Sequence, residues 1–191
     1  MSSRMIRTLT VGLMMSLGLP VALTACGGGQ TKVAEIKPGA MPDGADWRGV
    51  YFSKIYGTLH LVTEGDSVTG KWRTTSGDAW GELWGKADGD VLRFEWKQHK
   101  IGMVGPAATS KGRGYFRYVR PANGVDPDEI HGEWGLNEES TGNPWEAVRQ
   151  IRKEPDPDSV VPDEVESRVQ GGGEWDSSGN ESPSEAGGGE E

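Results

Sequence analysis

The chain has 191 residues, which is enough for one domain with extensions at its ends. Its net charge of −9 arises at the C-terminal end, because residues 154–191 hold twelve acidic residues and one basic residue. The rest of the chain has no basic stripe, which argues against nucleic acid as a partner. One cysteine in the whole chain excludes a disulfide framework within it.

The N-terminal residues follow the order of an export signal. Arg4 and Arg7 form a positive start, and residues 9–19 form an apolar stretch that is too short to span a bilayer. The tripeptide LTA then leads into Cys26. This arrangement resembles the lipobox of bacterial lipoproteins. The resemblance implies cleavage before Cys26, its acylation with chains such as palmitate, and a stable lipid anchor in the bacterial envelope. The alternative is an ordinary secretory signal with a spare thiol.

The composition divides the chain into four parts. We expect a lipoprotein signal peptide over residues 1–25, and a lipidated flexible tether over residues 26–46, which contain several Gly and Pro and no hydrophobic period. Residues 47–152 are the expected β-barrel domain. Residues 153–191 are expected to form a disordered acidic tail, because their Gly, Ser and Pro content opposes packing. The glycine after the cysteine, where aspartate would resemble an inner-membrane retention signal, favours the outer membrane.

The central part alternates apolar and polar residues with a period of two, which predicts strands and no helix. Clusters of Gly, Asp, Ser and Pro separate the segments at about ten-residue spacing. The eight expected strands cover residues 47–52, 57–63, 68–73, 79–87, 92–97, 112–119, 130–135 and 145–151. On this pattern Trp72, Trp96 and Trp134 fall on the core-facing side of their strands.

The strand glycines favour an eight-stranded antiparallel up-and-down β-barrel over a β-sandwich, which is the alternative. They are Gly49, Gly70, Gly81, Gly85, Gly114 and Gly132. Glycine inside a strand is costly unless it relieves a sharp bend or a close contact, as tight barrel curvature requires. Closure of the last strand onto the first would also remove both open sheet edges.

Short motifs in this part resemble a known way of building barrels. They are Trp-x-Gly-x-Tyr from Trp47, Gly-Thr-Leu-x-Leu from Gly57, Val-x-Gly-x-Trp from Val68, Trp-Gly-x-Leu-x-Gly from Trp80 and Gly-x-Trp ending at Trp134. These motifs look like those of small bacterial up-and-down barrels, of which the avidin-like and lipocalin-like folds are the best known. The resemblance implies a barrel and names no ligand.

The fourth strand carries the surplus of tryptophan. Trp80, Glu82 and Trp84 share one face, whereas Leu83 and two glycines share the other. If Leu83 faces inwards, the tryptophans form an exposed pair beside a carboxylate, which suits a sugar ring or a partner protein. If they face inwards, Glu82 lies in the lumen and needs a partner such as Arg149, or a ligand. We take Trp80, Glu82 and Trp84 as candidate ligand-binding residues.

No catalytic constellation is visible, so we do not expect an enzyme, a cofactor or a bound metal. His60, His99 and His131 are widely spaced and follow no zinc-binding pattern. We expect His60 on a solvent-facing side of its strand and His131 beside Glu133 on another. The glycine runs lack the lysine and the following helix of a phosphate-binding loop.

The sequence therefore predicts an envelope-anchored, non-enzymatic ligand-binding lipoprotein. Its ligand would be a small hydrophobic molecule or a glycan, bound at an open barrel end or on the face of Trp80 and Trp84. The alternative is a protein-interaction module, such as an inhibitor of a periplasmic or secreted enzyme, whose loop over residues 98–110 would insert into the target. A retained internal cavity would favour the first role, and a filled barrel with an exposed loop would favour the second.

Overall fold

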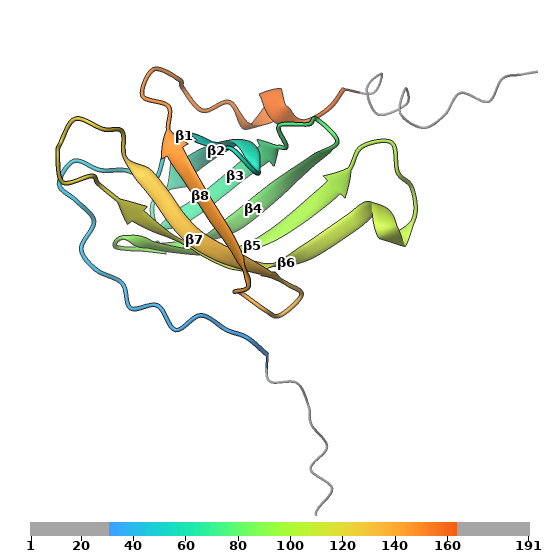
Figure 1. Ribbon diagram of the computed structural model, residues 1–191, viewed down its shortest axis with the longest axis horizontal. Helices are drawn as coiled ribbons and strands as arrows, with labels where there is room; N and C mark the ends of the chain where they lie inside the picture. Colours follow the sequence, from blue (N-terminus) through green and yellow to red (C-terminus); the bar gives the residue numbers. More distant parts are fainter. Residues whose placement is uncertain (1–30, 164–191) are drawn as a thin grey trace, which may run out of the picture. The chain divides into compact units, whose positions relative to one another are not determined.

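The structure is a computed structural model that describes residues 31–163. Eight antiparallel strands form a closed barrel in which each strand pairs with the next and β8 returns to β1 (Figure 1). The strands are β1 Gly49–Ser53, β2 Gly57–Glu64, β3 Ser67–Arg73, β4 Ala79–Asp88, β5 Val91–Lys100, β6 Thr109–Val119, β7 Glu129–Leu136 and β8 Asn143–Arg149. The predicted up-and-down barrel is confirmed, and closure rules out the sandwich.

The described part of the chain holds two short 3₁₀ helices, η1 (Pro106–Ala108) and η2 (Pro157–Val160). No helix within residues 31–163 has the length and apolar character needed to cross a bilayer. The sheet thus supplies nearly all of the regular structure, as the period of two predicts.

Aromatic side chains pack the interior of the barrel. The Trp145 ring lies 5.3 Å from the rings of both Trp72 and Phe116, measured between centroids, and 4.6 Å from the ring of Tyr56. Aromatic contacts of this kind add to the free energy that burial of the rings already provides. Side chains therefore occupy the space where an open barrel would hold a ligand.

The predicted core tryptophans lie where the strand pattern placed them. Trp72 and Trp96 are buried, and Trp134 is partly buried and packs edge-on against Trp96 at 5.1 Å between centroids. The strand glycines make this packing possible: a Cβ on Gly81 would lie 2.3 Å from ring atoms of Trp72. The interpretation of strand glycines as sites of close contact is thus confirmed.

Connections alternate between the two ends of the barrel. We call one the η1 end; its connections cover residues 54–56, 74–78, 101–108 and 137–142. We call the other the Asp128 end; its connections cover residues 65–66, 89–90 and 120–128. The chain also enters β1 and leaves β8 at the Asp128 end. The expected loop over residues 98–110 is shorter than predicted, because β5 extends to Lys100 and β6 begins at Thr109.

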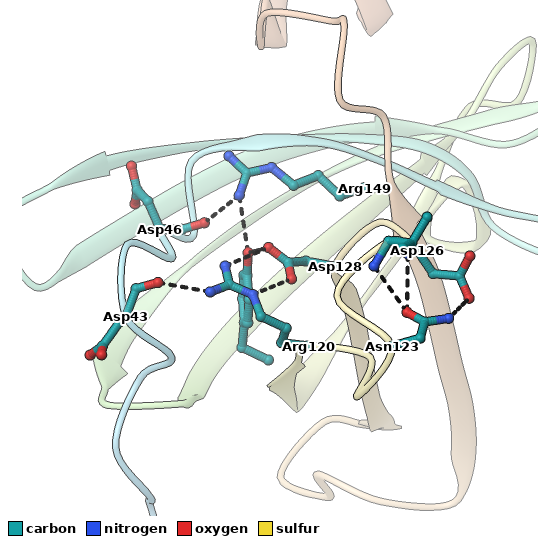
Figure 2. Close-up of polar contacts among 9 residues, drawn as sticks. Asp43, Asp46, Arg120, Asn123, Asp126, Asp128 and Arg149 are labelled. Carbon is teal, nitrogen blue, oxygen red and sulfur yellow. Dashed lines mark hydrogen bonds and ion pairs between the residues drawn. The ribbon is translucent and has the colours of Figure 1, made fainter.

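A polar network closes the Asp128 end (Figure 2). Asp128 accepts hydrogen bonds from the Tyr118 hydroxyl at 2.6 Å and from Nε of Arg120 at 2.8 Å. Arg149 donates to the Tyr118 hydroxyl at 3.0 Å, and Arg120 donates to the backbone oxygen of Asp43 at 2.7 Å. The hydrogen bond from Arg120 holds the pKa of the Asp128 carboxyl below its usual range. Arg149 is therefore part of this closure and does not pair with Glu82.

Residues 31–46 run along the outside of the barrel, and we call them the strap (Figure 1). The backbone oxygen of Lys32 accepts from the Ser140 N–H at 3.0 Å at the η1 end. The backbone N–H of Gly39 donates to the Asp90 carboxylate at 2.5 Å at the other end. These residues of the expected tether thus lie against the barrel, because backbone groups of the strap bond partners that are distant in sequence. The rest of the expected tether lies outside the described residues.

Beyond β8 the chain folds back over β2 and β3 through residues 154–161, the C-terminal segment (Figure 1). The Asp156 N–H donates to Nδ1 of His60 at 2.9 Å, and Val160 is buried. His60 points outwards as predicted, but the segment covers it, so the prediction of solvent exposure is wrong. This part of the expected acidic tail thus lies against the barrel. Residues 164–191 lie outside the described part.

Candidate functional site

The orientation of β4 is set by Leu83, which is buried in the lumen at 1 % exposure. Its neighbours Trp80, Glu82 and Trp84 therefore project from the outer face of the barrel. The first of the two predicted orientations is the observed one. All three candidate residues thus share one outward face, and none of them lies in the lumen.

The two outward tryptophans are not equivalent. The Trp80 ring stacks on the imidazole of His99, with 4.7 Å between centroids and 20° between planes. One face of that indole is therefore covered by a protein side chain. Trp84 lies about 13 Å further along the strand, since it is four residue steps from Trp80, and it is 43 % exposed. Of the pair, Trp84 has the indole that is available to a ligand.

Glu82 belongs with Trp80 and not with Trp84. Its carboxylate lies 3.8 Å from Nε2 of His99, the imidazole that stacks on Trp80. The strand register places Glu82 between Lys71 of β3 and Lys97 of β5. Glu82 therefore lies among cationic side chains of the sheet. It is placed to orient His99 and not to contact a ligand at Trp84.

A groove of about 570 Å³ lies beside Trp84 on the outer face of β4, β5 and β6. The strap forms one wall of it, and we call it the Trp84 groove. Its side chains that can form hydrogen bonds or stack are those of Trp84, Arg93, Glu95, Arg113, Tyr115 and Ser140. A second groove, of about 310 Å³, is also lined by Trp84. Trp84 thus contributes to two hollows of the surface.

Charged groups of opposite sign meet in and beside the Trp84 groove. Nε of Arg113 lies 3.6 Å from the Glu95 carboxylate, and Nη1 of Arg113 lies 2.6 Å from that of Glu138. The Tyr115 hydroxyl lies 3.5 Å from Glu133, and burial together with that carboxylate raises the pKa of Tyr115. The groove therefore offers both donors and acceptors beside an aromatic face.

Three indole N–H groups in the barrel interior have no hydrogen-bond partner among the described residues. They belong to Trp72, Trp134 and Trp145. A buried donor without an acceptor costs about 1–3 kcal/mol. An acceptor that reached one of these N–H groups would recover that free energy. The ring of Tyr56 packs against Trp145 and covers this part of the lumen. Sequence reasoning placed Trp72 and Trp134 in the core and carried no signal for their unpaired donors.

The remaining histidine, His131, lies on the outer face of β7 as predicted, and its side chain is 43 % exposed. Nε2 of His131 bonds the Glu129 carboxylate at 2.5 Å, while Glu133 accepts from the Gly142 N–H at 2.9 Å. His131 lines a groove of about 470 Å³ between β1 and β8, whose exposed apolar residues include Phe52. Within residues 31–163, no three His, Cys, Asp or Glu side chains are grouped to hold a metal ion.

No protein-family model, curated protein or solved structure matches this chain. What the structure shows is a closed barrel of eight antiparallel strands in chain order. Cys26, the expected site of lipid attachment, lies outside the described residues.

Proposed function

We propose that this protein is an envelope-anchored, non-enzymatic binding module that holds a glycan in the Trp84 groove. The observation that carries the proposal is the Trp84 indole, 43 % exposed at the edge of a groove with polar walls. Sugar rings present C–H groups that stack on an indole face and hydroxyl groups that need donors and acceptors. The packed lumen supports a site on the outside of the barrel.

The walls of the groove favour a glycan over a small hydrophobic molecule. Arg93, Glu95, Tyr115 and Ser140 contribute donors and acceptors around the indole. An apolar ligand would remove these groups from water without replacing their hydrogen bonds, which costs free energy. A ligand rich in hydroxyl groups would replace those bonds.

The N-terminal pattern supports the envelope location. A positive start, a short apolar stretch and the tripeptide LTA before Cys26 occur in the order of a lipoprotein signal. Acylation of Cys26 would provide the two or more chains that stable anchoring needs. The glycine that follows Cys26 supports placement in the outer membrane.

The test is a binding titration of the chain that begins at Cys26 with muropeptides and lipopolysaccharide-derived oligosaccharides. Tryptophan fluorescence and calorimetry measure the affinity of each. Trp84→Ala should weaken binding about tenfold or more, because it removes the stacking face.

Trp80→Ala is the matched control, since that indole is already stacked on His99. Its affinity should stay close to that of the wild type. Equal affinity of Trp84→Ala and the wild type, or no binding of either glycan class by the wild type, would refute the proposal.

A protein-interaction role is the second candidate. It is favoured by the filled lumen and by Val104, which is 95 % exposed in the loop between β5 and β6. In this role the loop would enter the cleft of a partner such as an envelope enzyme.

A further inference from the structure

The loop between β5 and β6, residues 101–108, presents an apolar tip at the η1 end. Val104 is 95 % exposed and Met103 is 45 % exposed. Gly102 and Gly105 flank the tip with φ of 75° and 87°, which favours glycine over other residues. Exposed apolar side chains at a loop tip gain free energy by leaving water for an apolar phase.

The stretch of chain that carries this tip is basic. No acidic residue occurs between Glu95 and Asp126 in the sequence. Lys100 lies directly before the loop, and Lys111 is the third residue of β6, which follows the loop. Lysine stems can lie along apolar material while the ammonium group reaches phosphate oxygens. An apolar tip with flanking lysines therefore fits the interface of an anionic phospholipid bilayer.

Three acidic residues in the connections of the same end oppose this charge. Glu138 and Glu139 lie in the loop between β7 and β8, and Asp78 lies in the loop between β3 and β4, where its backbone oxygen accepts from the Ile101 N–H at 2.9 Å. Arg113 neutralises Glu138 through the ion pair at 2.6 Å. The loop over residues 101–108 itself carries no charge, so it meets no repulsion of its own at a lipid surface.

The strap begins at the η1 end, a few residues after the expected site of lipid attachment in the sequence. Its first bonded residue is Lys32, whose backbone oxygen accepts from Ser140 in the β7–β8 loop. Five residues separate Lys32 from Cys26, and six residue steps span at most about 20 Å. An acylated Cys26 would therefore hold the η1 end close to the bilayer. This step rests on the proposed anchor.

We propose that the η1 end of the barrel docks on an anionic phospholipid surface, with Met103 and Val104 entering the interface. Ile55, which is 70 % exposed in the turn between β1 and β2, lies at the same end. The Asp128 end then points away from the membrane. The lipid chains attach the protein, and the loop orients it.

The experiment uses the only cysteine of the chain. The protein that begins at Cys26 is coupled through its thiol to a maleimide phospholipid in vesicles of phosphatidylcholine and phosphatidylglycerol. An amine-reactive acetylating reagent then modifies exposed lysines, and mass spectrometry measures each site. Acetylation of Lys54, Lys100 and Lys111 should fall about threefold or more relative to the uncoupled protein. Acetylation of Lys86 and Lys153, which flank the Asp128 end, should not change.

Paired variants separate the loop from the anchor. Met103→Asp with Val104→Asp should abolish the protection, because charged side chains disfavour the interface. The matched control is Val125→Asp, at a residue 82 % exposed in the β6–β7 loop at the opposite end. That variant should keep the protection.

Three results would overturn the docking proposal: equal acetylation at both ends, protection that survives the double substitution, or protection that only an added enzyme partner produces. The last result would assign the loop to protein interaction. Because the maleimide supplies the anchor, none of these results bears on natural acylation. The mass of the exported protein tests acylation of Cys26 separately.

Discussion

At the scale of single residues, the interior depends on positions that have no side chain. Gly81 of β4 pairs with Trp72 of β3, and the Trp72 indole covers it. Trp72 itself is only 2 % exposed. A Cβ on Gly81 would lie 2.3 Å from ring atoms, which is closer than van der Waals contact allows. The indole cannot move freely, because it also packs edge-on against Trp145.

Gly81→Ala should lower the free energy of unfolding by about 1–3 kcal/mol, the usual cost of overpacking a core. Chemical denaturation followed by tryptophan fluorescence measures the change. Glu82→Ala is the matched control, because Glu82 is the next residue of β4 and its side chain points out of the barrel. This substitution should change the free energy of unfolding by about 0.5 kcal/mol or less. An unchanged midpoint for Gly81→Ala would mean that Trp72 can shift without cost.

At the scale of elements, the C-terminal segment behaves as a cover for β2 and β3. Lys71 of β3 bonds Asp158 at 2.7 Å, and the N–H of Asp156 bonds His60 of β2 at 2.9 Å. Burial lowers the pKa of His60, although the nearby Asp156 opposes the shift. Nδ1 must be unprotonated to accept the hydrogen bond, so docking of the segment is linked to the charge on His60.

Docking of this segment should weaken as the pH falls. The undocked His60 has an ordinary pKa near 6.5 and a lower pKa when docked, with Lys153 adding to the lowering. The stabilisation is therefore fully present above pH 6.5 and is lost as the pH falls through the lower pKa that His60 has when the segment is docked.

Hydrogen exchange of the Asp156 amide, corrected for its intrinsic pH dependence, measures this docking at about pH 5 and about pH 8. Protection should be lower at the acidic pH. His60→Gln keeps an acceptor oxygen without a titrating group and should remove the pH dependence. Equal protection of the wild type at both values would contradict the linkage.

At the scale of the whole molecule, the two ends of the barrel differ in chemistry. The Asp128 end joins the strap, the β6–β7 loop and β8 through charged hydrogen bonds (Figure 2). The η1 end carries the exposed apolar residues Ile55, Met103 and Val104. Val125 and Ile151 are exposed at the Asp128 end as well, so the charged network is the feature that distinguishes the two ends.

Asp128→Asn should lower the free energy of unfolding at neutral pH by about 2 kcal/mol, because Arg120 and the Tyr118 hydroxyl lose a charged acceptor. The pKa of Asp128 is lowered in the fold, so its contribution is present above the ordinary value of 3.8 and is lost as the pH falls through the lower folded value.

Thermal unfolding across acidic pH measures both effects. The difference in midpoint between the wild type and Asp128→Asn should disappear as the pH falls below 3.8 and through the folded pKa of Asp128. Asp126→Asn is the control, since its carboxylate bonds only Asn123 within the same loop; it should unfold like the wild type. Equal midpoints for Asp128→Asn and the wild type at neutral pH would show that closure of this end does not depend on the charge.

The strands and their core faces could be predicted from the sequence because alternation is a local property. The positions of Trp72 and Trp96 follow from Val68 and Phe94, which lie an even number of positions away on the same strands. The glycine positions likewise indicated tight curvature. The candidate site could be predicted only as a set of residues, and the groove beside Trp84 was not visible, because the strap that walls it was expected to be free.

The sequence by itself determined the eight strands and the barrel class. It also determined the inward face of each strand that has apolar side chains on one side and polar side chains on the other. It could not orient β4, where both faces carry large side chains; pairing with β3 and β5 places Leu83 inside and Trp84 outside. It also missed the strap and the C-terminal segment. Their bonds join Ala34 to Ser140 and Asp156 to His60, about a hundred positions apart. Contacts that distant leave no local period, so only the tertiary structure decides them.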